Sequence, residues 1–157
     1  MLKFKVFILT ICFTINMVAA QEISNQSDKT RTDENEVRKL INNFIKGIDK
    51  QKGEQIIRTF YEGSSLYAFA PDGKKIITVS AKDFARLHEE KKFGGQERKL
   101  EIKDLTITDG ILASANVTAS NETVFYNYRL TFIKQEGKWL ILNMMQRSRP
   151  QYGKSKQ

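Results

Sequence analysis

The sequence has few of the residues that build metal sites, disulfides and acid–base catalysts. Its 157 residues include one cysteine, Cys12, one histidine, His88, and two prolines. One cysteine cannot close a disulfide within the chain, and one cysteine with one histidine cannot supply the four ligands of a structural zinc site. Acidic residues do not cluster at metal-ligand spacing either. We therefore expect no metal, no cofactor, and a fold that depends on its hydrophobic core.

A hydrophobic run long enough to cross a membrane is also missing. The apolar stretch Val6–Val18 falls short of the roughly 20 residues that a transmembrane helix needs. It follows Lys3 and Lys5 and ends in small residues up to Ala20. This pattern predicts a secretory signal peptide over residues 1–20, with an uncleaved anchor as the alternative. We expect the protein to be exported, either to the periplasm or out of the cell.

Acidic residues are fewer than basic ones, with 18 Asp and Glu against 26 Lys and Arg. The formal net charge is +8, and it falls to +6 when the two lysines of the predicted signal are removed. Residues 21–32 lack apolar spacing and are predicted to be a flexible leader, and residues 149–157 a disordered basic tail. One domain, residues 33–148, remains. Without a binding motif, the charge predicts no nucleic-acid partner and no stable membrane association after signal cleavage, only weak attraction to anionic surfaces.

Apolar residues recur at helical spacing in the first part of this domain. The series predicts an amphipathic helix with one buried face, formed by Val37, Leu40, Ile41, Phe44, Ile45 and Ile48. Asp33 and Glu36 have the spacing of a helix N-cap and its partner. The helix is therefore expected to begin at Asp33 and to end near Gln51.

Shorter elements follow this helix. A second helix is predicted over residues 54–61, and two short strands, 65–69 and 75–79, around the turn residues 71–73. Ser80 with Asp83 forms a second capping pattern, which predicts a third helix as far as about residue 89.

The second half of the domain alternates in polarity as strands do. Four strands are predicted: residues 98–108, residues 111–119, and the two strands within residues 125–145. The period of two breaks between Ile102 and Leu105, which predicts a bulge near Lys103-Asp104. Asp109-Gly110 predicts a tight hairpin turn. A long bent meander with helices gathered on one side indicates an α+β fold whose curved sheet wraps the helices into a cone.

Several segments together resemble a known family. They are FYEGSSLYAFAPDGK (residues 60–74), SAKDFARL (residues 80–87) and the terminal YNYRLTFIKQEGKWLILNMM (residues 126–145). The chain resembles the nuclear transport factor 2-like superfamily, most closely the small bacterial proteins described as putative lumazine-binding or SnoaL-like. The resemblance implies a cystatin-like cone, with three helices of the N-terminal half packed on a strongly curved, mainly antiparallel sheet. This superfamily includes isomerases, dehydratases and transport adaptors, so the resemblance implies no single function.

An acid–base catalyst is hard to find in this sequence. His88 stands in the polar stretch LHEEKK, where an exposed helix-end histidine is expected. The strand aspartate typical of the family is replaced by Asn127, and an amide cannot take up a proton at neutral pH. Glu101 and Asp104 flank the predicted bulge and could point inward. No catalytic residue is therefore assigned, although an enzyme using Glu101 or Asp104 with a tyrosine stays an alternative.

The remaining polar and aromatic residues are suited to binding. Arg129 and Asn127 share one strand face, and arginine presents a planar fork that fits carboxylate or phosphate. We predict a ligand site at the wide end of the cone, formed by Tyr61, Tyr126, Asn127, Arg129, Trp139 and Asn143. The predicted function is non-catalytic binding of a small, partly apolar ligand by a homodimer joined through the outer sheet face. A protein-interaction module whose cone is filled by its own side chains is a further alternative.

Overall fold

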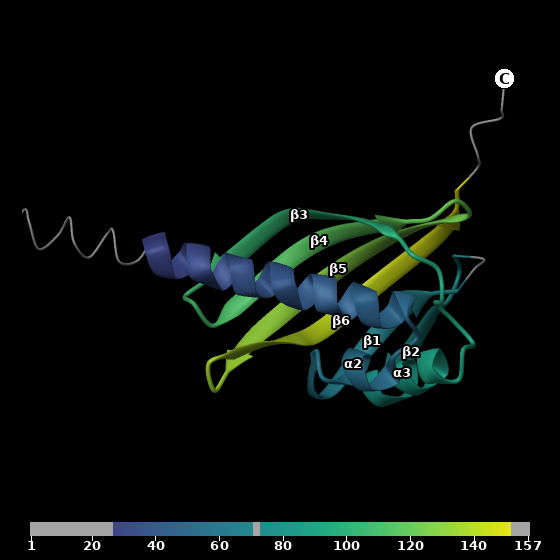
Figure 1. Cartoon of the computed structure of the whole chain (residues 1–157), viewed down its shortest axis with the longest axis horizontal. Coiled ribbons are helices and arrows are strands. Elements are labelled where there is room, and N and C mark those ends of the chain that lie inside the picture. The colour runs from purple at the N-terminus through teal and green to yellow at the C-terminus, as the bar shows by residue number, and fades with distance from the viewer. Residues whose placement is uncertain (1–26, 71–72, 152–157) are drawn as a thin grey trace, which may run out of the picture.

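The computed structural model describes residues 27–70 and 73–151. A long first helix, helical throughout residues 27–49, lies along the sheet (Figure 1). The predicted apolar stripe is confirmed, because it is this face that packs on the sheet. Its fully buried members are Val37, Ile41, Phe44, Ile45 and Ile48.

The predicted start of this helix is wrong. Residues 27–32, assigned to the flexible leader, are already helical, so Asp33 lies inside the helix and does not cap it. Its carboxylate is buried and accepts hydrogen bonds from Lys134 and Trp139 of the sheet. Tertiary contacts therefore decide this position, although the local pattern Asp33-x-x-Glu36 favours a cap. The predicted signal peptide lies outside the described residues.

The middle of the chain forms a short helix, a hairpin and a third helix. These are α2 (Gly53–Ile57), β1 (Phe60–Phe69), β2 (Ile76–Ser80) and α3 (Ala81–Glu89). The predicted second helix is too long, since the chain turns into β1 at Phe60 and pairs there in parallel with β6. The capping pattern before α3 is confirmed, because the Ser80 hydroxyl accepts from Asp83 N at 3.0 Å.

The last four strands form the predicted antiparallel meander. They are β3 (Lys99–Thr108), β4 (Leu112–Ser120), β5 (Val124–Gln135) and β6 (Lys138–Pro150), and the sheet order is β2-β1-β6-β5-β4-β3. The predicted bulge is confirmed by a register shift between Lys103 and Thr106, with Asp104 at φ 48°. Asp109 and Gly110 both have positive φ, as a two-residue hairpin turn requires.

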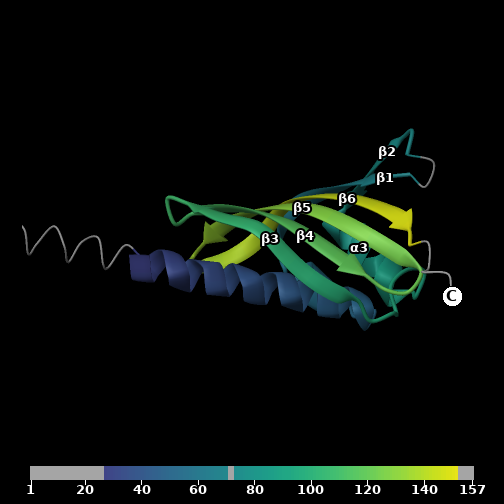
Figure 2. The ribbon, with the colours of Figure 1, turned by 90° about the horizontal axis from the view of Figure 1, so that it is seen from above.

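The sheet curves over the long helix (Figure 2), and its two faces differ in burial. Alternate residues of β5 point to opposite faces. Tyr128, Leu130 and Phe132 are buried against the helix, whereas Asn127 and Arg129 are exposed on the outer face. The predicted cone is therefore present, and its interior contains packed aromatic rings: Phe44 contacts the rings of Phe60, Phe84 and Tyr128.

Candidate functional site

A cleft of about 960 Å³ opens between α2, α3 and the start of β1. We call it the α2–α3 cleft. Its apolar part consists of Ile57, Phe60, Tyr61, Ala81 and Ala85. Ala81 and Ala85 lie one helical turn apart, so both small side chains face the cleft and leave room above α3. The cleft therefore combines an apolar floor with a polar rim, as small-molecule sites commonly do.

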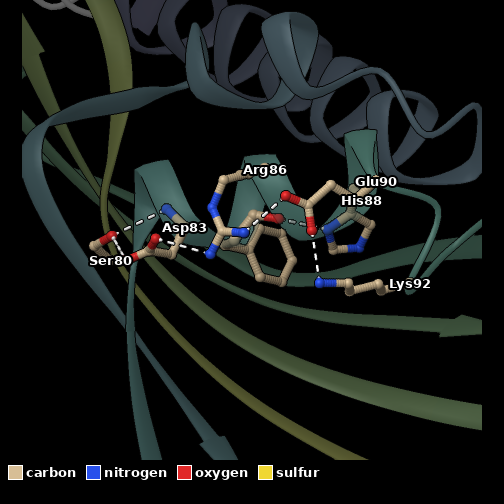
Figure 3. A network of polar contacts seen from close by, with 7 residues as sticks. Ser80, Asp83, Arg86, His88, Glu90 and Lys92 are labelled. Atoms are coloured by element: carbon tan, nitrogen blue, oxygen red, sulfur yellow. Dashed lines mark hydrogen bonds and ion pairs between the residues drawn. The ribbon is translucent and has the colours of Figure 1, made fainter.

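Part of the rim is an ion-pair network along α3 (Figure 3). Arg86 donates to Glu90 at 2.8 Å and to Asp83 at 3.3 Å, and Lys92 pairs with Glu90 at 2.7 Å. The Ser80 hydroxyl and the Arg86 guanidinium hold the pKa of Asp83 below its ordinary value. Lys92 and Arg86 do the same for the pKa of Glu90. Both carboxylates therefore stay ionised at neutral pH, which suits binding and not general acid catalysis.

The cleft wall depends on a close approach between α2 and α3. The carboxylate of Glu89 accepts a hydrogen bond from the backbone N–H of Gly53. A Cβ atom at Gly53 would lie 2.7 Å from Glu89 Oε2 and 2.9 Å from the carbonyl oxygen of Ala85. Glycine is required here because any larger residue would push the two helices apart and change the width of the cleft.

A second cleft, of about 740 Å³, lies on the other side of α2 toward the long helix. It shares Glu54 and Glu89 with the first. The remaining residues around it are mostly polar or charged: Leu40, Asn43, Lys52, Gln55, Arg58 and Thr59. It lacks an aromatic wall, so the α2–α3 cleft is the better candidate for a partly apolar ligand.

The structure does not gather the predicted ligand-binding residues into one place. Tyr61, half-buried, lines the α2–α3 cleft. Tyr126 lies on the inner face and stacks on Tyr128 at a ring distance of 6.0 Å. Asn127 and Arg129 point away from the helices, and Arg129 Nε donates to Asn116 at 3.3 Å. A role of any of these residues in ligand binding stays a prediction.

Two further predicted ligand-binding residues have structural partners. Trp139 is buried, and its indole nitrogen donates to Asp33 at 3.1 Å. Asn143 is half-buried in the middle of the sheet, between Ser65 of β1 and Thr131 of β5. Neither residue lines the α2–α3 cleft, although Ser65, the strand partner of Asn143, does.

The expectation for His88 is wrong. His88 is only 3% exposed, and its ring packs against that of Phe84 at a centroid distance of 4.3 Å and near that of Phe93 at 6.2 Å. Its Nδ1 is 2.8 Å from the carbonyl oxygen of Phe84. Burial lowers the pKa of His88, and the nearby charge of Arg98 lowers it further. The polar sequence around His88 misled the prediction, since helix periodicity places His88 on the inner face with Phe84.

Sequence reasoning missed Arg98, which lies between the end of the long helix and β5. Its side chain is 4% exposed, and its Nε donates to Asp49 at 2.6 Å while Nη1 donates to the Tyr128 hydroxyl at 2.9 Å. The guanidinium also lies 5.2 Å from the ring centre of Tyr126. Arg98 therefore joins the end of the long helix to β5. The sequence pattern could have revealed this, because Arg98 alternates with Leu100 and Ile102 and so lies on the same face as these apolar residues.

The candidate acids of the enzyme alternative lie outside the cone. Glu101 and Asp104 are both exposed. Thr118 donates to Glu101, and Asn116 donates to Asp104 at 3.1 Å on the outer face. Within residues 27–70 and 73–151, no group of three His, Cys, Asp or Glu side chains is arranged to hold a metal ion. In the same ranges, no helix is both long and apolar enough to cross a membrane.

A curved mixed sheet, mostly antiparallel, around a long helix and two shorter ones defines the nuclear transport factor 2-like, or cystatin-like, class of folds. Within this class, the chain belongs to the family described as putative lumazine-binding, whose model matches residues 32–146. No curated protein matches the chain.

Solved structures agree on the fold. A nuclear transport factor 2-like protein of unknown function from Shewanella baltica OS155 is 17% identical, with a TM-score of 0.66 over 74% of this chain and 94% of its own. A ketosteroid isomerase-like protein from Erwinia carotovora atroseptica is 14% identical, with a TM-score of 0.57 over 72% of this chain and 93% of its own. Identities this low establish the shared fold alone.

Proposed function

We propose that this protein binds a small, partly apolar molecule in the α2–α3 cleft without transforming it. The observation that carries the proposal is the composition of the cleft. Ile57, Phe60 and Tyr61 supply an apolar and aromatic floor, while Lys82 and Arg86 stand at its rim. Apolar walls with a few placed polar groups favour binding of a molecule that is flat or compact and carries one polar edge.

The charge state of Glu90 favours a binder over an enzyme. Glu90 lines the cleft, and its contacts with Lys92 and Arg86 hold its pKa below the ordinary value. General acid catalysis at neutral pH needs a carboxyl group with a raised pKa beside the reacting atom. His88 turns its ring toward Phe84 and the core, so it is not available as a base in the cleft.

The family description supports a heteroaromatic ligand. A lumazine is a flat, fused ring system, and the half-buried ring of Tyr61 offers a face against which such a ligand could stack. Arg86 and Lys82 would then face the polar edge of the ring. Tyr61 belongs to β1, whereas Lys82 and Arg86 belong to α3. The distance between β1 and α3 would therefore limit the size of a ligand that contacts both.

Native mass spectrometry of the protein purified from its own host tests the proposal first, because it reports retained small molecules and subunit number together. Lumazine is then titrated by isothermal calorimetry into the wild type, Tyr61→Ala and Tyr67→Ala. Tyr67 is also half-buried on β1 but does not line the cleft, so it is the matched control. We expect Tyr61→Ala alone to weaken binding. A cleft that retains nothing and takes up no lumazine contradicts the proposal.

We also propose that the protein is exported and forms a homodimer through the outer sheet face near the β5–β6 turn. Support comes from the apolar residues on that part of the sheet, Ile111 (55% exposed) and Leu112 (44% exposed), and from the pair Ile133 and Leu140. Light scattering of the wild type and Leu140→Glu tests the dimer. A mature N-terminus at Gln21 in a periplasmic or culture fraction tests export.

A further inference from the structure

Three arginines gather on the outer face of the sheet, at the end away from the β5–β6 turn. Arg129 belongs to β5, and Arg147 and Arg149 to β6. The antiparallel register places Arg149 beside Phe125 and Arg147 beside Asn127, and all of these side chains alternate with buried ones such as Tyr128. We call the group Phe69, Phe125, Arg129, Arg147 and Arg149 the basic outer patch.

Within residues 27–70 and 73–151, these arginines form no ion pair with an acidic side chain. Arg129 reaches an acid only indirectly, since Asn116 accepts from Arg129 and donates to Asp104. A patch with three cations and no direct counter-charge attracts an anionic surface.

Two of the guanidinium groups lie on aromatic rings. Arg149 is 4.7 Å from the ring centre of Phe125, and Arg147 is 5.9 Å from that of Phe69. A guanidinium stacked in this way keeps its in-plane N–H groups free to bind phosphate oxygens. The arginines cover the ring faces, so the rings are not open platforms for nucleic-acid bases, which single-strand binding proteins require.

Exposed apolar side chains stand beside the cations. Ile76 pairs with Phe69 across β1 and β2, and it is 60% exposed. Met145 pairs with Arg129 across β5 and β6, and it is 43% exposed. The β1–β2 hairpin projects from the sheet on the side away from the long helix (Figure 2). Apolar groups mixed with cations match the boundary between lipid headgroups and acyl chains.

We propose that the basic outer patch docks the protein reversibly on anionic phospholipid membranes, with the arginines on lipid phosphates and Ile76 at the acyl boundary. A second copy of the chain is a poor occupant, because facing patches would bring arginines together. The patch and the α2–α3 cleft share no residue, so docking leaves the cleft free. This inference does not depend on the proposed ligand.

Vesicle co-sedimentation tests it, using phosphatidylcholine alone and phosphatidylcholine with 30% phosphatidylglycerol. We expect binding to the anionic vesicles alone, and weaker binding at 300 mM than at 50 mM salt. Arg147→Gln/Arg149→Gln should weaken it about 30-fold, since each cation near an anionic membrane contributes about 1 kcal/mol and 1.4 kcal/mol is tenfold. Arg147→Lys/Arg149→Lys retains the charge and should retain most of the binding.

The matched control is Arg38→Gln/Arg58→Gln, which removes the same charge from exposed positions on the long helix and just after α2. It should reduce binding less than threefold. Equal losses in the two double variants would show a general charge effect and overturn the proposal. So would tighter binding to single-stranded DNA or to polyglutamate than to the vesicles, or no vesicle binding at 50 mM salt. Circular dichroism confirms that each variant is folded.

Discussion

Asp33 is the residue whose removal should test the packing of this fold most directly. Its side chain is 1% exposed, and Oδ1 accepts from Lys134 Nζ at 2.5 Å and from Trp139 Nε1 at 3.1 Å. These contacts join the long helix to β5 and β6 across about a hundred residues of sequence. Breaking a buried ion pair by removing one partner costs about 3–5 kcal/mol. Lys134 is 21% exposed and retains Glu36 at 3.4 Å, so part of that cost is recovered.

We therefore expect Asp33→Asn to lower the free energy of unfolding by about 2–4 kcal/mol at pH 7, measured by urea denaturation. The matched control is Asp28→Asn on the same helix, whose ion pair with Arg31 is exposed. Exposed pairs contribute about 0–1 kcal/mol, so this control should change little. A loss at Asp33→Asn no larger than that of the control would refute the reasoning.

The pH dependence of this effect has a definite sign. Burial alone would raise the pKa of Asp33, but the hydrogen bonds from Lys134 and Trp139 outweigh burial and hold the pKa below its ordinary value. A lowered pKa in the folded state contributes stability that is present above the unfolded-state pKa and lost as pH falls through the folded-state pKa. The difference between wild type and Asp33→Asn should thus be constant from pH 7 to about pH 5 and shrink below about pH 4. A difference that persists undiminished at the acid end would contradict the assignment.

Further predictions concern residues of the core and the loops. His88 is the single histidine, and its pKa is lowered in the folded state, so the free energy of unfolding should fall as pH drops below about 6.5. The His88 ring resonance in proton NMR should titrate with a midpoint below about 6.5. A midpoint at or above that value would contradict the burial of the ring. Gly94→Ala should cost about 2 kcal/mol or more in urea unfolding, because a Cβ there would lie 2.3 Å from a carbonyl oxygen of the long helix at a positive φ. Gly63→Ala, with similar φ and open space around it, should cost only about 1 kcal/mol and is the control. Arg98→Met should destabilise by about 3–5 kcal/mol through the unpaired Asp49, and the double variant with Asp49→Leu should recover most of that loss.

Periodicity predicted most of the fold because burial depends on it directly. The stripe from Val37 to Ile48 and the alternation in β5 each identify the buried face correctly. The bulge at Asp104 was predictable as well, since a shift of one residue would otherwise turn the apolar side chains of β3 outward. These features are local, so the spacing of apolar residues within a single segment is enough to predict each of them.

Pairings between distant segments were not predictable from such patterns. Asp33 carries the local signature of a cap, but a lysine and a tryptophan far along the chain determine its position. The local pattern around Phe60 predicts a helix, but Phe60 instead begins β1 and pairs in parallel with Ile141 of β6. The candidate site depends on the same kind of information, because the cleft forms where α2 meets α3 and only Tyr61 of the predicted ligand-binding residues lines it.

The distribution of charge supports the proposal that this protein binds a ligand without transforming it. Among the described residues, the interior contains Arg98, which is paired with Asp49, and Tyr128, whose pKa is raised by burial. A tyrosine with a raised pKa does not release its proton at neutral pH. Accessible charged side chains stand on the rim of the α2–α3 cleft and on the basic outer patch. The proposed ligand site and the proposed membrane-docking surface therefore each present charged groups, and because they share no residue, each can be tested without altering the other.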